Sequence, residues 1–126
     1  MRRMSSTRDP RTFALIGAAM DVHNELGPGF LEAVYQESLE IELRGRSVPF
    51  VAKRPIHLNY KAARLEAHYI PDFLAFDTVV MEIKAQRALG RADFAQLINS
   101  LRCSGLRTGL LVNFGEESLR WKRFVL

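Results

Sequence analysis

The segment 69–84 constrains the fold of this chain most, because it inserts charged residues into two short apolar runs. Asp77-Thr78 separates the runs, which predicts two antiparallel strands joined by a tight turn. Side chains two apart on a strand share a face, so Glu82 and Lys84 point away from the apolar residues that alternate with them. A carboxylate and an amine on a buried strand cost free energy unless they pair or bind a metal. The charges therefore indicate a site.

The register of this strand pair decides whether Asp72, which precedes the first run, joins the other two charges. A two-residue connection at Asp77-Thr78 would pair Asp72 with Ile83 and turn its carboxylate to the opposite face. A three-residue connection or a bulge flips the face, and we expect it to bring Asp72 opposite Lys84 and diagonal to Glu82. The site therefore requires the odd register or an irregular start at Pro71.

Two carboxylates that converge from adjacent strands would offer hard oxygen ligands, which Mg²⁺ favours while it keeps several waters. A lysine beside them could hold or deprotonate a water molecule acidified by the metal. The same residues could instead form an ordinary Glu82–Lys84 pair on a solvated sheet face, with Asp72 in a turn after Pro71. The spacing alone leaves both interpretations open.

Two patterns resemble a known family. Pro71-Asp72, nine further residues and then Glu82-Ile83-Lys84 resemble the signature of the PD-(D/E)XK nuclease superfamily. The run Gly29-Phe-Leu-Glu-Ala-Val-Tyr35 resembles the motif that names the GxxExxY protein family, a branch of that superfamily. The resemblance extends from about Phe13 to the C-terminus. It implies an α/β fold with a restriction-endonuclease-like core, in which helices flank a mixed central β-sheet.

The resemblance also implies a function, Mg²⁺-dependent hydrolysis of phosphodiester bonds in DNA, with RNA as the second choice and Mn²⁺ as a substitute metal. Asp72 and Glu82 would bind the metal together with the Ile83 carbonyl, and Lys84 would position or activate water. Glu32 would support the metal or its water. Three further residues would position the substrate: His23, Tyr35 and Gln96.

Each of the residues outside segment 69–84 also has a structural explanation. Glu32 at a helix N-terminus is favoured by the helix dipole, and Tyr35 would then be half-buried core. A single histidine such as His23 is typically structural, and Gln96 could be a hydrogen-bonding residue near a helix start. Exonuclease-like branches of the superfamily carry a tyrosine four residues after this glutamine, where this chain has Ser100. The alternative function is a module that binds nucleic acid or a protein partner without cleaving it.

The remaining patterns predict an N-terminal helical hairpin and further strands. Asp9-Pro10 is typical of a helix start, and Gly27-Pro-Gly29 should end this first helix after Leu26. We expect a second helix over 31–44 with four inward residues: Leu31, Val34, Leu39 and Leu43. A third helix is expected over 93–104, with inward residues Phe94, Leu97, Ile98 and Leu101. Strands are expected within 47–60, 64–70, 108–113 and 119–125.

The length favours one domain over 10–126, preceded by a flexible basic tail over 1–9. The net charge is +4 and 14 of the 18 basic residues are arginine, which suits phosphate contacts and a nucleic-acid partner. Four basic residues could flank such a partner or simply be solvated: Lys53, Arg54, Lys61 and Arg64.

The single Cys103 excludes an internal disulfide and fits a cytoplasmic location. No stretch approaches the length that spans a membrane. We expect a homodimer or a protein partner to supply target specificity.

Overall fold

The computed structural model describes residues 9–126, which form three helices and seven strands. In chain order these are α1 (Pro10–Leu26), α2 (Glu32–Gly45), β1 (Phe50–Ala52), β2 (Ile56–Tyr60), β3 (Ala63–Tyr69), β4 (Phe73–Ala75), β5 (Val79–Lys84), α3 (Arg91–Ser104), β6 (Thr108–Asn113) and β7 (Arg120–Val125). The predicted tail, apart from Asp9, lies outside the described residues. None of the helices within 9–126 is long and apolar enough to cross a membrane.

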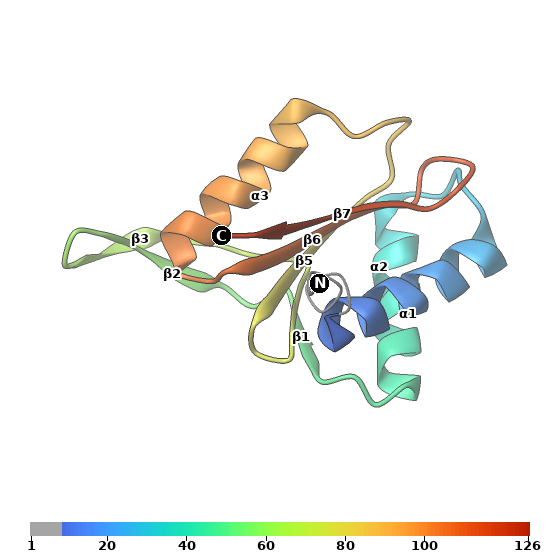
Figure 1. The fold of residues 1–126 in the computed structure, drawn as a ribbon, viewed down its shortest axis with the longest axis horizontal. Helices are drawn as coiled ribbons and strands as arrows, with labels where there is room; N and C mark the ends of the chain where they lie inside the picture. Colours follow the sequence, from blue (N-terminus) through green and yellow to red (C-terminus); the bar gives the residue numbers. More distant parts are fainter. Residues whose placement is uncertain (1–8) are drawn as a thin grey trace, which may run out of the picture.

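Five strands form a mixed sheet in the order β1-β4-β5-β6-β7 (Figure 1). Only the central pair β5–β6 is parallel among these strands, and the chain makes that crossover through α3. The strands β2 and β3 form a separate two-stranded hairpin. The predicted α/β fold, with a mixed sheet flanked by helices and an N-terminal helical hairpin, is confirmed.

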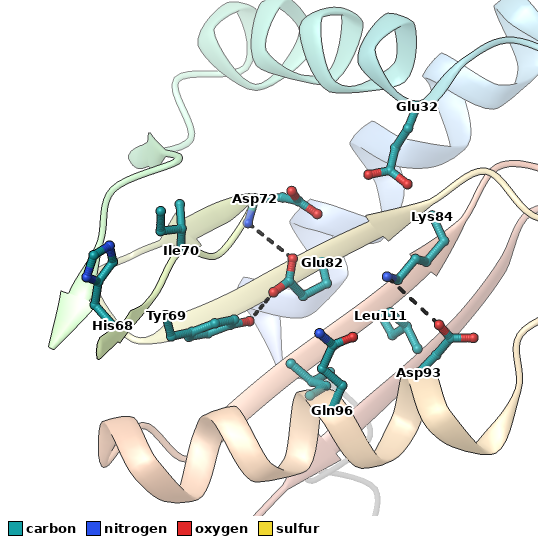
Figure 2. A pocket seen from close by; sticks show the side chains of 11 residues that line it. Glu32, His68, Tyr69, Ile70, Asp72, Glu82, Lys84, Asp93, Gln96 and Leu111 are labelled. Atoms are coloured by element: carbon teal, nitrogen blue, oxygen red, sulfur yellow. Dashed lines mark hydrogen bonds and ion pairs between the residues drawn. The ribbon is translucent and has the colours of Figure 1, made fainter. Parts of the chain in front are cut away.

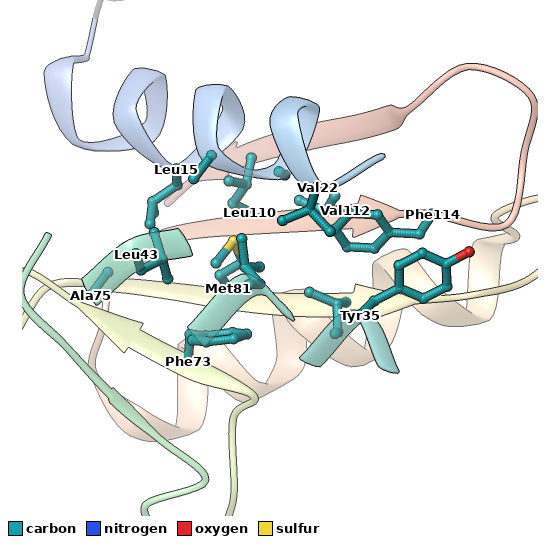
Figure 3. Close-up of a cluster of buried hydrophobic side chains, with 14 of the residues drawn as sticks. Leu15, Val22, Tyr35, Leu43, Phe73, Ala75, Met81, Leu110, Val112 and Phe114 are labelled. Atoms are coloured by element: carbon teal, nitrogen blue, oxygen red, sulfur yellow. The ribbon is translucent and has the colours of Figure 1, made fainter. Parts of the chain in front are cut away.

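The two faces of the sheet are covered by different helices. On one face, Leu15 of α1 and Leu43 of α2 pack on the alternating strand residues Met81, Leu110 and Val112, as Figure 3 shows. On the other face α3 packs Leu97 and Leu101 against Val80 and Leu111. Because side chains alternate along a strand, Glu82 and Lys84 follow Val80 onto the face that α3 covers. The charged residues of β5 therefore lie on the α3 side.

The helix ends follow from local chemistry. Asp9 caps α1, because its Oδ1 accepts a hydrogen bond from the Arg11 N–H at 2.9 Å. Gly27 ends α1 with a φ of +70°, a conformation that favours glycine.

The predicted inward face of α2 was partly wrong. Leu31 is 80% exposed and Val34 is 37% exposed, whereas Tyr35, Leu39 and Leu43 are buried. Leu31 precedes the helix as its N-cap, and the buried stripe takes every fourth residue from Tyr35, so Val34 falls outside it. In α3 the predicted Leu97 and Leu101 are buried, while Phe94 and Ile98 are half-buried.

The connection between β4 and β5 has the odd length that the site requires. Ala75 pairs with Val79, and Phe76, Asp77 and Thr78 lie between them. Phe76 and Asp77 both have positive φ, and the Thr78 N–H donates to the Ala75 carbonyl at 3.1 Å. The predicted partner was wrong, however. The extra loop residue is Phe76, on the N-terminal side of the turn. Continued past the Phe73–Met81 pair, this register places Asp72 opposite Glu82 and not opposite Lys84.

Candidate active site

A pocket lies between the end of β3, the outer part of β5 and the first turns of α3 (Figure 2). Five residues that the sequence predicts for the site line this pocket: Glu32, Asp72, Glu82, Lys84 and Gln96. They come from α2, the β3–β4 connection, β5 and α3. The fold therefore gathers side chains that are up to 64 positions apart, from 32 to 96, around one cavity.

Asp72 and Glu82 are linked through the backbone. The Asp72 side chain is nearly buried, and its Oδ2 accepts a hydrogen bond from the Ile83 N–H at 2.8 Å. The Asp72 N–H in turn donates to Oε1 of Glu82 at 3.2 Å. Oδ1 of Asp72 accepts from Nζ of Lys53 at 2.5 Å. The two carboxylates therefore lie side by side, held by groups whose positions the strands fix.

The environment of Glu82 opposes its negative charge. Burial, and then the hydrogen-bonding contact with Asp72, raise the pKa of Glu82 to about 8. Oε2 of Glu82 accepts a hydrogen bond from the Tyr69 hydroxyl, which acts in the opposite direction. Burial and the charge of Glu82 also raise the pKa of Tyr69, so the phenol remains a donor. A bound cation would offset the negative charge of the adjacent Asp72 and Glu82 carboxylates.

Lys84 lies two residues after Glu82 and connects β5 to α3. Its Nζ is 3.8 Å from Oδ1 of Asp93. Oδ2 of Asp93 accepts from the Gly90 N–H at 2.9 Å and from Nε2 of Gln86 at 3.0 Å. The same carboxylate thus caps α3 and holds the lysine. This arrangement orients the ammonium group toward the pocket without burying it fully.

Glu32 and Gln96 face the pocket from opposite sides. Glu32 is the first residue of α2, and partial burial followed by the charge of Asp72 raises its pKa. Figure 2 shows Gln96 pointing from α3 toward Glu82 and Lys84. The pocket consequently combines four carboxylates, those of Glu32, Asp72, Glu82 and Asp93, with the Lys84 ammonium group and the Gln96 amide.

The structure does not bring two of the predicted positioning residues, Tyr35 and His23, to the pocket, because both side chains are buried away from it. Tyr35 is fully buried and its ring stacks on Phe114 with the centroids 4.6 Å apart. Its hydroxyl donates to the Gly27 carbonyl at 2.5 Å and accepts from the Phe30 N–H at 3.2 Å. His23 is 6% exposed, and its Nε2 lies 2.9 Å from the Glu116 carbonyl oxygen, to which it donates. Both residues therefore hold loops in place and have no surface for substrate.

Three residues of the site were missed by the sequence reasoning. Tyr69 and Asp93 were not considered, and Lys53 was considered only as a flank of a nucleic-acid groove. Tyr69 also contacts the hydroxyl of Ser100 on α3. The only available signal was the position of Tyr69, three residues before Asp72.

A divalent metal such as Mg²⁺ requires oxygen ligands, which carboxylates supply. Within residues 9–126, no group of three or more histidine, cysteine, aspartate or glutamate side chains is arranged to hold a metal ion. Asp72 and Glu82 nevertheless fit Mg²⁺, which binds through one or two carboxylates and keeps several waters. Their oxygens are hard ligands, and the pKa values of Glu82 and Glu32 are raised first by burial and then by the nearby Asp72.

Comparison with known proteins places the chain in a family. The sequence model of the PD-(D/E)XK nuclease superfamily matches residues 9–124. The chain belongs to the PD-(D/E)XK nuclease superfamily. The motif of this superfamily corresponds here to Pro71-Asp72 and Glu82-Ile83-Lys84. These residues supply the two paired carboxylates and the lysine of the pocket.

One solved structure is similar to this chain in shape. It is an alkaline exonuclease from Laribacter hongkongensis, with a TM-score of 0.48 and 16% sequence identity. The alignment covers 86% of this chain and 66% of the exonuclease chain. No curated protein matches this chain.

Proposed function

We propose that this protein is a metal-dependent nuclease of the GxxExxY type, which hydrolyses phosphodiester bonds in DNA, with RNA as the second choice. One observation carries the proposal: the carboxylates of Asp72 and Glu82 are fixed side by side in a pocket that also contains Lys84. Membership of the nuclease superfamily supports a phosphodiester hydrolase.

Asp72 and Glu82 would hold Mg²⁺, or Mn²⁺ in its place, as the cofactor. The Ile83 carbonyl is the proposed third ligand from the protein. The hydrogen bond from the Ile83 N–H to Asp72 holds this residue beside the carboxylate. When bound, such a metal supplies Lewis-acid stabilisation of negative charge on the phosphoryl oxygens. The two carboxylates determine where that charge is offset, since the backbone holds both of them.

The remaining residues would hold the water and the substrate. Lys84, which Asp93 orients, would hold the attacking water by hydrogen bonding from its Nζ. Glu32 would bind the same water from the other side, and its raised pKa makes it a better proton acceptor than an ordinary glutamate. The Gln96 amide would donate to a phosphate oxygen and position the substrate.

The experiment is a cleavage assay with labelled single-stranded and double-stranded DNA and RNA, in Mg²⁺, in Mn²⁺ and in EDTA. Asp72→Ala and Lys84→Ala are assayed beside the wild type, and Lys122→Ala, an exposed lysine on β7, is the matched control. Circular dichroism melts establish that each variant is folded. We expect cleavage that requires metal, is lost in both site variants and persists in the control.

Three other outcomes distinguish the alternatives. Cleavage that survives in Lys84→Ala would come from a contaminating nuclease and would contradict the proposal. If no substrate is cut and Mg²⁺ does not raise the melting temperature, the non-cleaving binding module becomes the better function. A metal-dependent rise in melting temperature without cleavage would instead indicate a nuclease that requires a protein partner or a second copy.

A further inference from the structure

The β2–β3 hairpin has one apolar and one polar face. Directly opposite residues on paired strands share a face, and the pairs here are Ile56–Tyr69, His57–His68, Asn59–Arg64 and Tyr60–Ala63. Ile56 and Leu58 are half-buried, and β2 lies against α3. The opposite face carries four exposed polar side chains, which we call the polar face of the hairpin: His57, Asn59, Arg64 and His68.

The polar face begins at the pocket and leads away from it. His68 lines the pocket beside Tyr69, and Figure 2 shows it on the side away from Lys84. In Figure 1 the hairpin extends away from the five-stranded sheet toward its turn at Lys61. At about 3.3 Å per residue, the four positions from His57 to Tyr60 span about 10 Å. A ligand that occupies the pocket can therefore continue along this face.

The chemistry of the polar face suits an anion. The four side chains that define it can each donate a hydrogen bond, and Lys61 adds a second cation at the turn. In the described part of the chain neither Lys61 nor Arg64 has an ion-pair partner, although Nζ of Lys61 lies 5.4 Å from the Tyr60 ring centroid. Glu66 is the one carboxylate among residues 56–69, and strand alternation puts it on the same face as Arg64 and His68, where it is outnumbered by the two cations. The cations are thus available to a ligand.

We propose that the polar face of the hairpin binds the phosphate backbone of the nucleic-acid strand whose scissile phosphate enters the pocket. The inference rests on the proposed nuclease function and names how the substrate of that site is held. Arg64 offers the planar donor pair that suits phosphate, and Lys61 offers a point charge. At 3.4 Å of axial rise per nucleotide, a face of about 10 Å accommodates about three nucleotides. Such contacts fix register without reading sequence.

The test measures binding in a Lys84→Ala background with Mg²⁺ present, so that cleavage does not consume the probe. Fluorescence anisotropy gives the dissociation constant for single-stranded and double-stranded DNA and RNA over a series of salt concentrations. Lys61→Ala/Arg64→Ala removes two charges from the hairpin. Arg102→Ala/Lys122→Ala removes two exposed charges from α3 and β7 and is the matched control.

We expect the hairpin double variant to bind about tenfold more weakly or worse, with a salt slope on duplex DNA that is lower by about 2. The control should bind as the background protein does. Equal losses in both variants, an unchanged salt slope in the hairpin variant, or no binding to any of the four nucleic acids would overturn the proposal.

The result separates this inference from the proposed function. A protein that binds through the hairpin, but cuts no substrate and is not stabilised by Mg²⁺, would contradict the nuclease function and retain the binding surface. A wild type that cleaves, with a hairpin variant that binds equally well, would retain the nuclease and eliminate the hairpin as its substrate contact. Melts of both double variants confirm folding, since all four substituted side chains are exposed.

Discussion

The Asp72 N–H donates to the Glu82 carboxylate at 3.2 Å, while the N–H of the residue after Glu82 donates back to the Asp72 carboxylate at 2.8 Å. This reciprocal arrangement fixes both acids before any cation arrives. It also holds two negative groups close together in a partly buried place, and the pKa of Glu82 is about 8 for that reason. The site is therefore preorganised at an electrostatic cost, and the first three predictions follow from that cost.

Glu82→Gln should stabilise the metal-free protein as the pH rises. The folded-state pKa of Glu82 is about 8, against an ordinary value of 4.5, so its ionisation opposes folding. The penalty is absent below the ordinary value, grows as the pH rises above it and is complete above pH 8. We expect the variant to be more stable by on the order of 2 kcal/mol at the alkaline end and equal to wild type at the acidic end. Urea denaturation in EDTA measures this gap, and a gap that does not vary with pH would contradict the raised pKa.

Tyr69→Phe should weaken metal binding near neutral pH. The Tyr69 hydroxyl stabilises the ionised form of Glu82, so its removal raises the pKa of Glu82 further. Protons then compete better with the metal, and we expect about tenfold weaker Mg²⁺ binding at pH 7. The loss should shrink at higher pH, where Glu82 is ionised in both proteins. Calorimetric titrations across the pH range test this, and a loss that is the same at every pH would indicate a purely structural role for Tyr69.

Lys53→Gln should strengthen metal binding. Nζ of Lys53 lies 2.5 Å from Oδ1 of Asp72, so the lysine neutralises a carboxylate that the metal would use. Without this cation the carboxylates repel one another more, and Mg²⁺ should bind about fivefold more tightly, or about 1 kcal/mol. The dissociation constant from a thermal-shift titration measures the change. Weaker binding in the variant would show that Lys53 and the metal do not compete.

Tyr35→Phe should destabilise the fold without changing the chemistry. The hydroxyl is the hydrogen-bonding partner of the Gly27 carbonyl and of the Phe30 N–H. Its loss leaves both groups unpaired in the turn between α1 and α2, at a cost of about 1–3 kcal/mol. Denaturant unfolding measures this cost. Cleavage by the folded variant should match that of wild type, and a selective rise in KM would restore the substrate-positioning role.

Gly115→Ala should be strongly destabilising. A Cβ at this position would overlap the backbone of Gln86, in the loop that follows β5. Asn113 bridges the same loops, because its Oδ1 accepts from the Gln86 N–H at 2.9 Å and from the Gly115 N–H at 3.1 Å. We expect a loss of about 3 kcal/mol or more, measured by thermal or urea unfolding.

The matched control for this prediction is Gly45→Ala. Nothing lies within 4 Å of the added Cβ at this last position of α2, so the substitution should be neutral or mildly stabilising. If Gly115→Ala is tolerated as well as the control, the loops after β5 and β6 do not approach as closely as the structure shows.

The carboxylate pair was predictable because strand alternation and turn length are local rules. These rules required an odd register at Asp72, and the structure has one. They could not choose which strand would contribute the extra residue, so the partner of Asp72 was misassigned to Lys84. That choice depends on Phe76 adopting a positive φ, which nothing in its chemistry favours.

Tyr69 and Tyr35 show the limit of reasoning from motifs. Tyr69 enters the site because the β2–β3 hairpin folds beside α3, a tertiary arrangement that leaves no periodic signal in the sequence. Tyr35 belongs to the motif that drew attention to the site, yet its ring fills the core. The helical spacing of Glu32 and Tyr35 did not show that the helix divides them between the pocket and the core.

The strand β5 separates core packing from the charged site by residue position alone. Val79, Met81 and Ile83 pack under α1 and α2, whereas Glu82 and Lys84 face the pocket. A substitution at either charged position leaves the packing beneath it untouched. A single substitution could therefore remove or change the charged site while the fold stays intact. Descendants of this protein could in this way exchange catalysis for recognition without a new fold.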